Sequence, residues 1–249
     1  MMGRRSSPGA GVLVLGAAGA VVFALFGGCS ESPREVRPPT SAETTSDTPK
    51  VQQPAEPASP TDAAFPFADV AAAKEAVVNL PAKGRAPLTD YNREAFGVPW
   101  SDTNDNGCDT RNDILRRDLM DTRVADCMVM SGVLRDPYSG DRISFVRGPV
   151  TSLDVQIDHV VPLANAWQTG ASYWTPAKRE RFANDRRNLL AVRGDLNLQK
   201  SDGDAATWLP PRKAFRCEYV AIQVLTKQRY GLWVTPAEKV AMQRILDRC

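Results

Sequence analysis

Histidine is almost absent from this chain. His159 is the only one among 249 residues, so any chemistry that needs an imidazole must use this single ring. The sequence also lacks a Gly-x-Ser-x-Gly turn, a glycine-rich phosphate loop and a Cys-x-x-Cys pair. These absences argue against serine hydrolases of that type, P-loop enzymes and zinc sites built on close histidine or cysteine pairs, including a zinc-dependent cell-wall hydrolase.

A strong net charge is missing as well. The formal charge of the whole chain is +2, and residues 63–249 carry 26 basic and 23 acidic side chains. This balance excludes a basic coat for tight, non-specific binding of nucleic acid, so a polyanion would have to bind at a local patch. The densest basic run comprises Lys178, Arg179, Arg181, Arg186 and Arg187. Such a run fits a surface that follows a phosphate backbone or an ordinary solvated helix face.

The first 62 residues have the composition of export and linker segments. Two arginines precede an uncharged run from Gly11 to Phe26, which predicts a signal peptide over residues 1–28; an uncleaved N-terminal anchor is the alternative. Residues 29–62 are rich in Pro, Ser, Thr and Glu. Such a segment buries too little apolar surface to fold, so we expect a disordered tether. Residues 63–249 have the length of one folded domain.

Cys29 directly follows Gly27 and Gly28. A cysteine after two small residues resembles the lipobox of bacterial lipoproteins, in which that cysteine is acylated after cleavage. Phe26 stands at the position where that motif usually has leucine. The resemblance implies a lipid anchor at Cys29 that holds the protein on the outer face of the cell membrane. The alternative is an ordinary secretory signal in which Cys29 has no role.

The other four cysteines are Cys108, Cys127, Cys217 and Cys249. In an exported chain an even set of cysteines indicates disulfide bonds, and a set of this size allows three connectivities. We favour the pairs Cys108–Cys127 and Cys217–Cys249, because each closes a local loop. The spacing of these cysteines does not fit a zinc cluster.

Local patterns predict a domain of mixed α and β structure. Helices are expected over residues 67–79, from Asp109 through Leu119, from Pro162 through Trp167, over 177–183, around Leu196 and Leu198, and over 212–230 and 236–248. Strands are expected over 128–134 and 143–146 as a hairpin, up to Asp158, and over 188–192. The capping box Thr235-Pro-Ala-Glu238 begins the last helix.

The strand that leads into Asp158 carries residues suited to phosphodiester chemistry. His159 follows it, and the carboxamides Asn188 and Asn197 come later in the same stretch. Hydrolysis of a phosphodiester needs a base for the attacking water and neutralisation of the phosphate charge; a neutral imidazole near pH 7 suits the first task. Neighbours on a strand point to opposite faces, so the strand must end or kink here if both Asp158 and His159 serve one site. Pro162 favours such an end.

The order Asp158-His159, Asn188, Asn197-x-x-Lys200 resembles that of the HNH, or His-Me finger, endonucleases, and especially the HNH domain of CRISPR effector nucleases. The wider run over residues 156–211 also resembles an exported HNH branch found in bacterial lipoproteins. The resemblance implies an α+β fold in which a ββα core holds one divalent metal ion. Surrounding helices and the two disulfide bonds would then complete the domain.

The resemblance also implies a role for each motif residue. His159 would act as general base, Asn188 would hold it in orientation, and Lys200 would contact the scissile or a neighbouring phosphate. The Asp158 carboxylate and the Asn197 amide oxygen would bind the metal. An oxygen-only shell favours Mg²⁺ or Mn²⁺ over Zn²⁺ and implies modest affinity in the absence of substrate.

Arg111 is a second candidate for phosphate binding, provided that the Cys108 bridge fixes it near the site. An ion pair on the helix face is the alternative, and it is narrowly preferred. Together these features predict a secreted or surface-tethered, metal-dependent endonuclease that is monomeric and acts on nucleic acid, with DNA favoured over RNA. The competing function is a non-catalytic surface binding module on an HNH scaffold. The presence of both His159 and Asn197 favours the enzyme, because a module without catalysis need not keep both.

Overall fold

The computed structural model describes residues 68–149 and 151–249. The expected signal peptide, the tether with Cys29 and the expected start of the domain at residue 63 lie outside the described residues. Within the described part of the chain, none of the helices combines the length and the apolar character that crossing a membrane requires.

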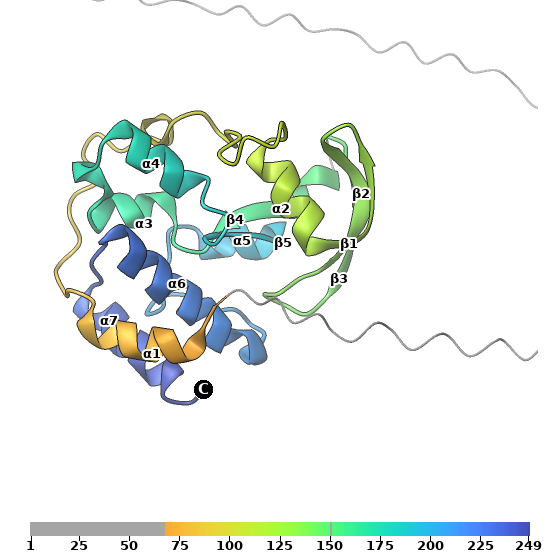
Figure 1. Ribbon diagram of the computed structural model, residues 1–249. Helices are drawn as coiled ribbons and strands as arrows, with labels where there is room; N and C mark the ends of the chain where they lie inside the picture. The colour runs from red at the N-terminus through yellow and green to blue at the C-terminus, as the bar shows by residue number, and fades with distance from the viewer. Residues whose placement is uncertain (1–67, 150) are drawn as a thin grey trace, which may run out of the picture. The chain divides into compact units, whose positions relative to one another are not determined.

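The described residues form α-helices and short strands (Figure 1). The helices are α1 (Val70–Asn79), α2 (Thr110–Asp118), α3 (Leu163–Gln168), α4 (Pro176–Ala183), α5 (Gly194–Lys200), α6 (Arg216–Tyr230) and α7 (Pro236–Leu246). The strands are β1 (Leu119–Ala125), β2 (Met128–Arg135), β3 (Arg142–Val146), β4 (Val155–His159) and β5 (Leu189–Arg193). Short 3₁₀ turns are η1 (Glu94–Phe96), η2 (Thr151–Leu153), η3 (Ala171–Tyr173) and η4 (Lys213–Phe215). The mixed α+β class expected from the sequence is therefore observed.

The strands form two separate antiparallel sheets. β1, β2 and β3 make a three-stranded sheet, and β4 pairs with β5 alone. The hairpin of β2 and β3 confirms the prediction, whereas β1 corrects it: the helix that was expected to run through Leu119 ends at Asp118, and Leu119 begins a strand. The reason is tertiary, since Leu119 pairs with Leu134 of β2 and is buried in the core below that sheet.

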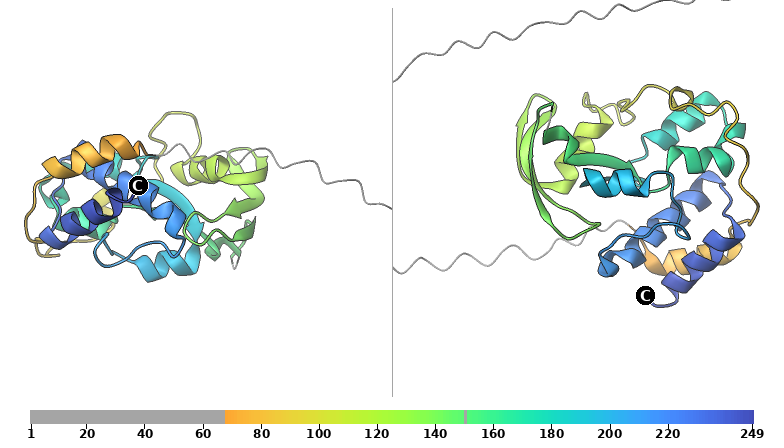
Figure 2. Two further views of the ribbon diagram at one scale, coloured as in Figure 1. Left: turned by 90° about the horizontal axis from the view of Figure 1, so that it is seen from below. Right: turned by 180° about the vertical axis from the view of Figure 1, so that it is seen from behind.

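The β4–β5 pair lies between two hydrophobic cores. Alternate residues of a strand face opposite sides, and both sides of β5 are buried. Leu189 and Ala191 pack in one core with α2 and the three-stranded sheet, while Leu190 and Val192 pack in the other with α1, α6 and α7. The views in Figure 2 show β4 and β5 between the larger sheet and the helices. Burial on both sides fixes the position of every residue along these two strands.

Both expected disulfide bonds are present. Cys108 is bonded to Cys127, and Cys217 to Cys249. The first bond ties the segment before α2 to the turn between β1 and β2. The second joins the start of α6 to the end of the chain, beyond α7. The loops that they close are therefore local, as the spacing of the cysteines suggested.

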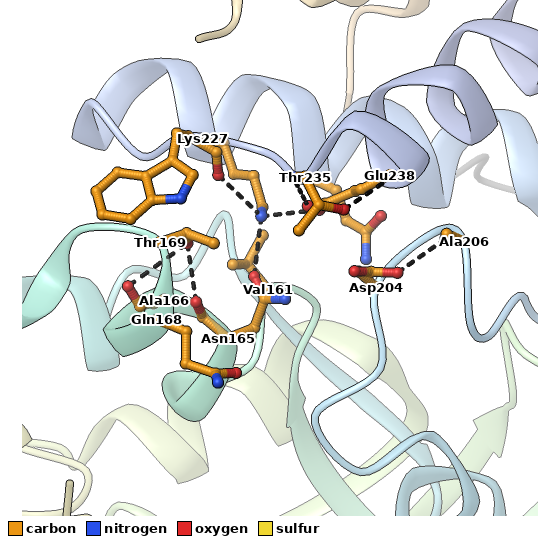
Figure 3. A network of polar contacts seen from close by, with 12 residues as sticks. Val161, Asn165, Ala166, Gln168, Thr169, Asp204, Ala206, Lys227, Thr235 and Glu238 are labelled. Carbon is orange, nitrogen blue, oxygen red and sulfur yellow. Dashed lines mark hydrogen bonds and ion pairs between the residues drawn. The ribbon is translucent and has the colours of Figure 1, made fainter. Parts of the chain in front are cut away.

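A buried ion pair joins α6 to the beginning of α7 (Figure 3). Lys227 Nζ lies 2.8 Å from Glu238 Oε1, and both residues are buried. The same Nζ donates to the Asn165 side-chain oxygen on α3 at 2.9 Å. Glu238 also accepts from the backbone of Thr235, and this completes the capping box that the sequence predicts for α7. One buried ammonium thus connects α3, α6 and α7.

Candidate active site

A pocket of about 330 Å³ opens where β4 ends and α5 begins its last turn. Asp158, His159 and Asn197 all line it. The positions follow from the β4–β5 pairing, in which His159 is the last residue of β4 and lies opposite Leu189. The tight start of α5 requires Gly194, since a Cβ atom there would lie 2.0 Å from the carbonyl oxygen of Leu153. The strand end and the following helix therefore place three of the sequence-predicted residues around one cavity.

The Asp158 carboxylate is buried and has two strong partners. Lys200 Nζ donates to Oδ1 at 2.8 Å, and the Tyr138 hydroxyl donates to Oδ2 at 2.5 Å. Lys200 Nζ also donates to the carbonyl oxygen of His159 at 2.9 Å. Burial raises the pKa of Tyr138 well above its usual value, and the charge of Asp158 adds to the shift, so the hydroxyl keeps its proton. A carboxylate has about four acceptor sites, which leaves Asp158 able to bind a further ligand.

The His159 ring is held in one tautomer. Its Nε2 lies 2.8 Å from the Ala183 carbonyl oxygen, which can only accept, so Nε2 carries the proton and Nδ1 is free to accept one. The Trp100 ring lies nearly parallel to the imidazole, with centroids 6.0 Å apart. Burial lowers the pKa of His159 to about 4, and the nearby charge of Arg93 acts in the same direction. The imidazole is therefore neutral at physiological pH.

This burial gives the stability of the metal-free protein a specific pH dependence. The pKa of His159 is about 4 in the folded chain and 6.5 for the ordinary side chain. Between these values the unfolded chain binds a proton that the folded chain does not, so the free energy of unfolding falls as the pH is lowered, by roughly 3 kcal/mol in all. We expect denaturant unfolding in EDTA to show this loss in the wild type relative to His159→Gln. Parallel pH profiles of the two proteins would contradict a buried, neutral ring.

Asn188 fixes the chain just after His159. Its side-chain oxygen accepts from the backbone N–H of Val161 at 2.8 Å, and its side-chain nitrogen donates to the Val161 carbonyl at 3.1 Å. The backbone N–H of Val160 donates to the Asn188 carbonyl at 2.9 Å. Asn188 lies just before β5 rather than inside it, and it is fully buried. These contacts terminate β4 and turn the chain towards α3.

Asn197 has one side-chain atom engaged and one free. Its nitrogen donates to the Gln156 side-chain oxygen on β4 at 2.9 Å. No described residue donates a hydrogen bond to its oxygen, and the residue lines the pocket beside Asp158. The described residues hold no group of three His, Cys, Asp or Glu side chains spaced to bind a metal. Any metal here would therefore rely on Asp158, on the Asn197 amide oxygen and on ligands from water or substrate.

Two residues expected at the phosphate lie elsewhere. The Lys200 ammonium has no exposed surface, because Asp158 and the His159 carbonyl occupy it. Arg111 donates to the carbonyl of Val155, at the opposite end of β4 from His159, and does not line the pocket. Lys200 lies three residues after Asn197 on α5, a spacing that puts the two side chains on the same side of a helix. The spacing does not predict that the buried Asp158 carboxylate packs against this side of α5 and pairs with Lys200.

Three residues of the site have no sequence signal that marks them. Tyr138 reaches Asp158 from the turn between β2 and β3, where Gly140 adopts a φ of 89°. Trp100 covers His159 from a loop, with a φ of 60° that bulky side chains rarely adopt. Arg93 lines the pocket from the segment before η1. All three come from segments distant in sequence, so only the tertiary structure brings them to the motif.

Comparison with known proteins identifies the family of the chain. Residues 109–245 match the family of GmrSD restriction endonucleases, C-terminal domain, and the matched segment contains β4, β5 and α5. An uncharacterized secreted protein of Arthroderma benhamiae is 37% identical over 193 residues, which cover 76% of this chain and 90% of that protein. No solved structure matches the chain. Because the matched segment spans more than half of its length, the chain belongs to the family of GmrSD restriction endonuclease C-terminal domains.

Proposed function

We propose that this protein is an exported, metal-dependent endonuclease that hydrolyses phosphodiester bonds of nucleic acid, with DNA favoured over RNA. One observation carries the proposal: a neutral imidazole, a carboxylate and a free amide oxygen line a single pocket within the segment that matches a restriction endonuclease family. The two disulfide bonds suit an extracellular location, and the relative from Arthroderma benhamiae is described as secreted. Anchoring through an acylated Cys29 is part of the proposal.

The donor atoms of the pocket fit a hard divalent cation. Asp158 and Asn197 offer oxygen, and the Asn197 oxygen has no hydrogen bond from a described residue. Oxygen donors favour Mg²⁺ or Mn²⁺. Because Lys200 already balances the charge of Asp158, we expect weak binding of the metal until a phosphate adds its own charge. Once bound, the metal would neutralise charge on the phosphate and lower the pKa of water.

The protein's own groups would then act around the phosphate. His159 accepts the proton of the attacking water at Nδ1, since Nε2 is held by the Ala183 carbonyl. Asn188 keeps the backbone after His159 in place through Val161. Lys200 and Tyr138 fix the Asp158 carboxylate from two sides, and Gln156 fixes the Asn197 amide. Each reactive side chain is thus oriented by a second residue, as catalysis at defined geometry requires.

The test is cleavage of plasmid DNA and of single-stranded RNA by the purified protein. We expect nicking and linearisation of DNA with Mg²⁺ or Mn²⁺, loss of activity in EDTA, and slower cleavage of RNA. Equal cleavage in EDTA would exclude the metal-dependent mechanism. No cleavage of either nucleic acid with any divalent metal would exclude the enzyme.

A binding module on the same scaffold is the second candidate. It is favoured by one observation, namely that both Asp158 oxygens are already paired inside the protein. This candidate predicts that nucleic acid is bound but not cleaved, whatever metal is added. Measuring binding and cleavage in the same samples therefore separates the two.

A further inference from the structure

One arginine lines the pocket without an ion-pair partner among the described residues. Arg93 is the only lysine or arginine among the described residues that line it. Two carboxylates line the pocket as well. Asp158 pairs with Lys200 at 2.8 Å, and Asp202 lies 3.7 Å from Arg85, which also pairs with Asp204 at 2.7 Å. Among the described residues, no carboxylate lies within ion-pair distance of Arg93. Its guanidinium is therefore available to bind an anion in the pocket.

The segment that carries Arg93 is firmly anchored. Directly after it, η1 places Phe96 in a buried core together with Phe182 and Trp167. The Arg179 side chain on α4 donates to the Ala95 carbonyl at 2.7 Å. The backbone around Arg93 is therefore positioned by the same α4 whose last residue, Ala183, holds the ring of His159.

We infer that Arg93 forms a phosphate-binding subsite in the wall of the catalytic pocket and takes the part that the resemblance to HNH endonucleases implies for Lys200. This inference rests on the proposed action on nucleic acid. Arginine suits the task, because its planar guanidinium binds two phosphate oxygens at once and stays charged at all relevant pH values. Arg93 lies before residue 109, outside the segment that matches the family. The subsite is therefore a contribution of the preceding segment of this chain.

The test is equilibrium binding of a fluorescent single-stranded oligonucleotide to the full protein in EDTA, followed by anisotropy over a range of salt concentrations. We expect Arg93→Ala to weaken binding about tenfold or more. The slope of log affinity against log salt should fall by about 0.7, the value for one phosphate contact on a single strand. Arg93→Lys should restore part of the affinity, since lysine keeps the charge but not the bidentate geometry. Arg244→Ala, which removes an exposed arginine of α7, is the matched control and should bind as the wild type does.

Wild-type affinity and an unchanged salt slope in Arg93→Ala would overturn the inference, and so would a wild type that binds no oligonucleotide. The outcomes also separate this inference from the proposed function. If the wild type cleaves DNA and Arg93→Ala has the same KM, the subsite is refuted and the nuclease stands. If binding depends on Arg93 but no metal supports cleavage, the subsite stands and the nuclease is refuted.

Discussion

Replacement of His159 by alanine is expected to lower the rate of phosphodiester cleavage by about 10²–10⁴-fold, the usual loss when a general base is removed. The imidazole is neutral, with burial lowering its pKa to about 4, and Nδ1 is its only free nitrogen. No second histidine exists in the chain to replace it. The measurement is the single-turnover rate on a labelled duplex at saturating Mn²⁺, because additional metal does not restore the rate that is lost with a general base.

Folding must be controlled in this experiment, since His159 is buried beneath Trp100. The variant His159→Gln fills more of the cavity, and it should fold and remain inactive. Leu198→Ala is the matched control: Leu198 lines the same pocket but is largely exposed and has no polar side-chain atom. It should keep nearly full activity. A well-folded His159→Ala or His159→Gln with wild-type turnover would refute the role of His159 as base.

Replacement of Lys227 by methionine is expected to lower the free energy of unfolding by about 3–5 kcal/mol, because it leaves a buried Glu238 without its partner. Burial lowers the pKa of Lys227 and raises that of Glu238, so each charge depends on the other. The lost ammonium also contacts Asn165 on α3, the helix that follows β4. Chemical denaturation at neutral pH measures the loss.

The double variant Lys227→Met with Glu238→Gln tests the cause. Glutamine removes the charge but can still accept from Thr235 in the capping box of α7. We therefore expect the double variant to be more stable than Lys227→Met alone. Lys74→Met, on the exposed side of α1, should change the free energy of unfolding by less than about 0.5 kcal/mol. A double variant as unstable as the single one would show that packing, rather than the unpaired charge, causes the loss.

The sequence predicts those features that depend on neighbours in the chain. The hairpin of β2 and β3, the Thr235 capping box and the order of β4, β5 and α5 are all set by local patterns, and the structure contains each of them. The pairing of the cysteines follows from their loop lengths in the same way. The local pattern also predicts that β4 ends near Pro162. In the structure β4 ends at His159, and Asp158, His159 and Asn197 line one pocket.

Features that depend on distant contacts are not predictable in this way. Leu119 continues the helical pattern of α2, yet pairing with β2 draws it into a strand. Lysine is usually a surface residue, yet the Lys200 side chain is buried because it pairs with the buried carboxylate of Asp158 on β4. Tyr138 and Trp100 reach the site from segments with no motif at all. Ion pairs between residues distant in the sequence decide which basic side chain faces the pocket. Spacing along the chain does not predict these ion pairs.

A titration of the cleavage rate with Mn²⁺ in Asn197→Ala tests most directly the proposal that a metal held in this pocket drives hydrolysis. Asn197 is preferable to Asp158 for this purpose, because loss of Asp158 would also leave the buried Lys200 unpaired. The variant removes the oxygen that we propose as a neutral ligand of the metal, so we predict an activation curve shifted to higher Mn²⁺ concentration, with partial recovery of the rate at saturation. An activation curve that coincides with that of the wild type would contradict the proposal.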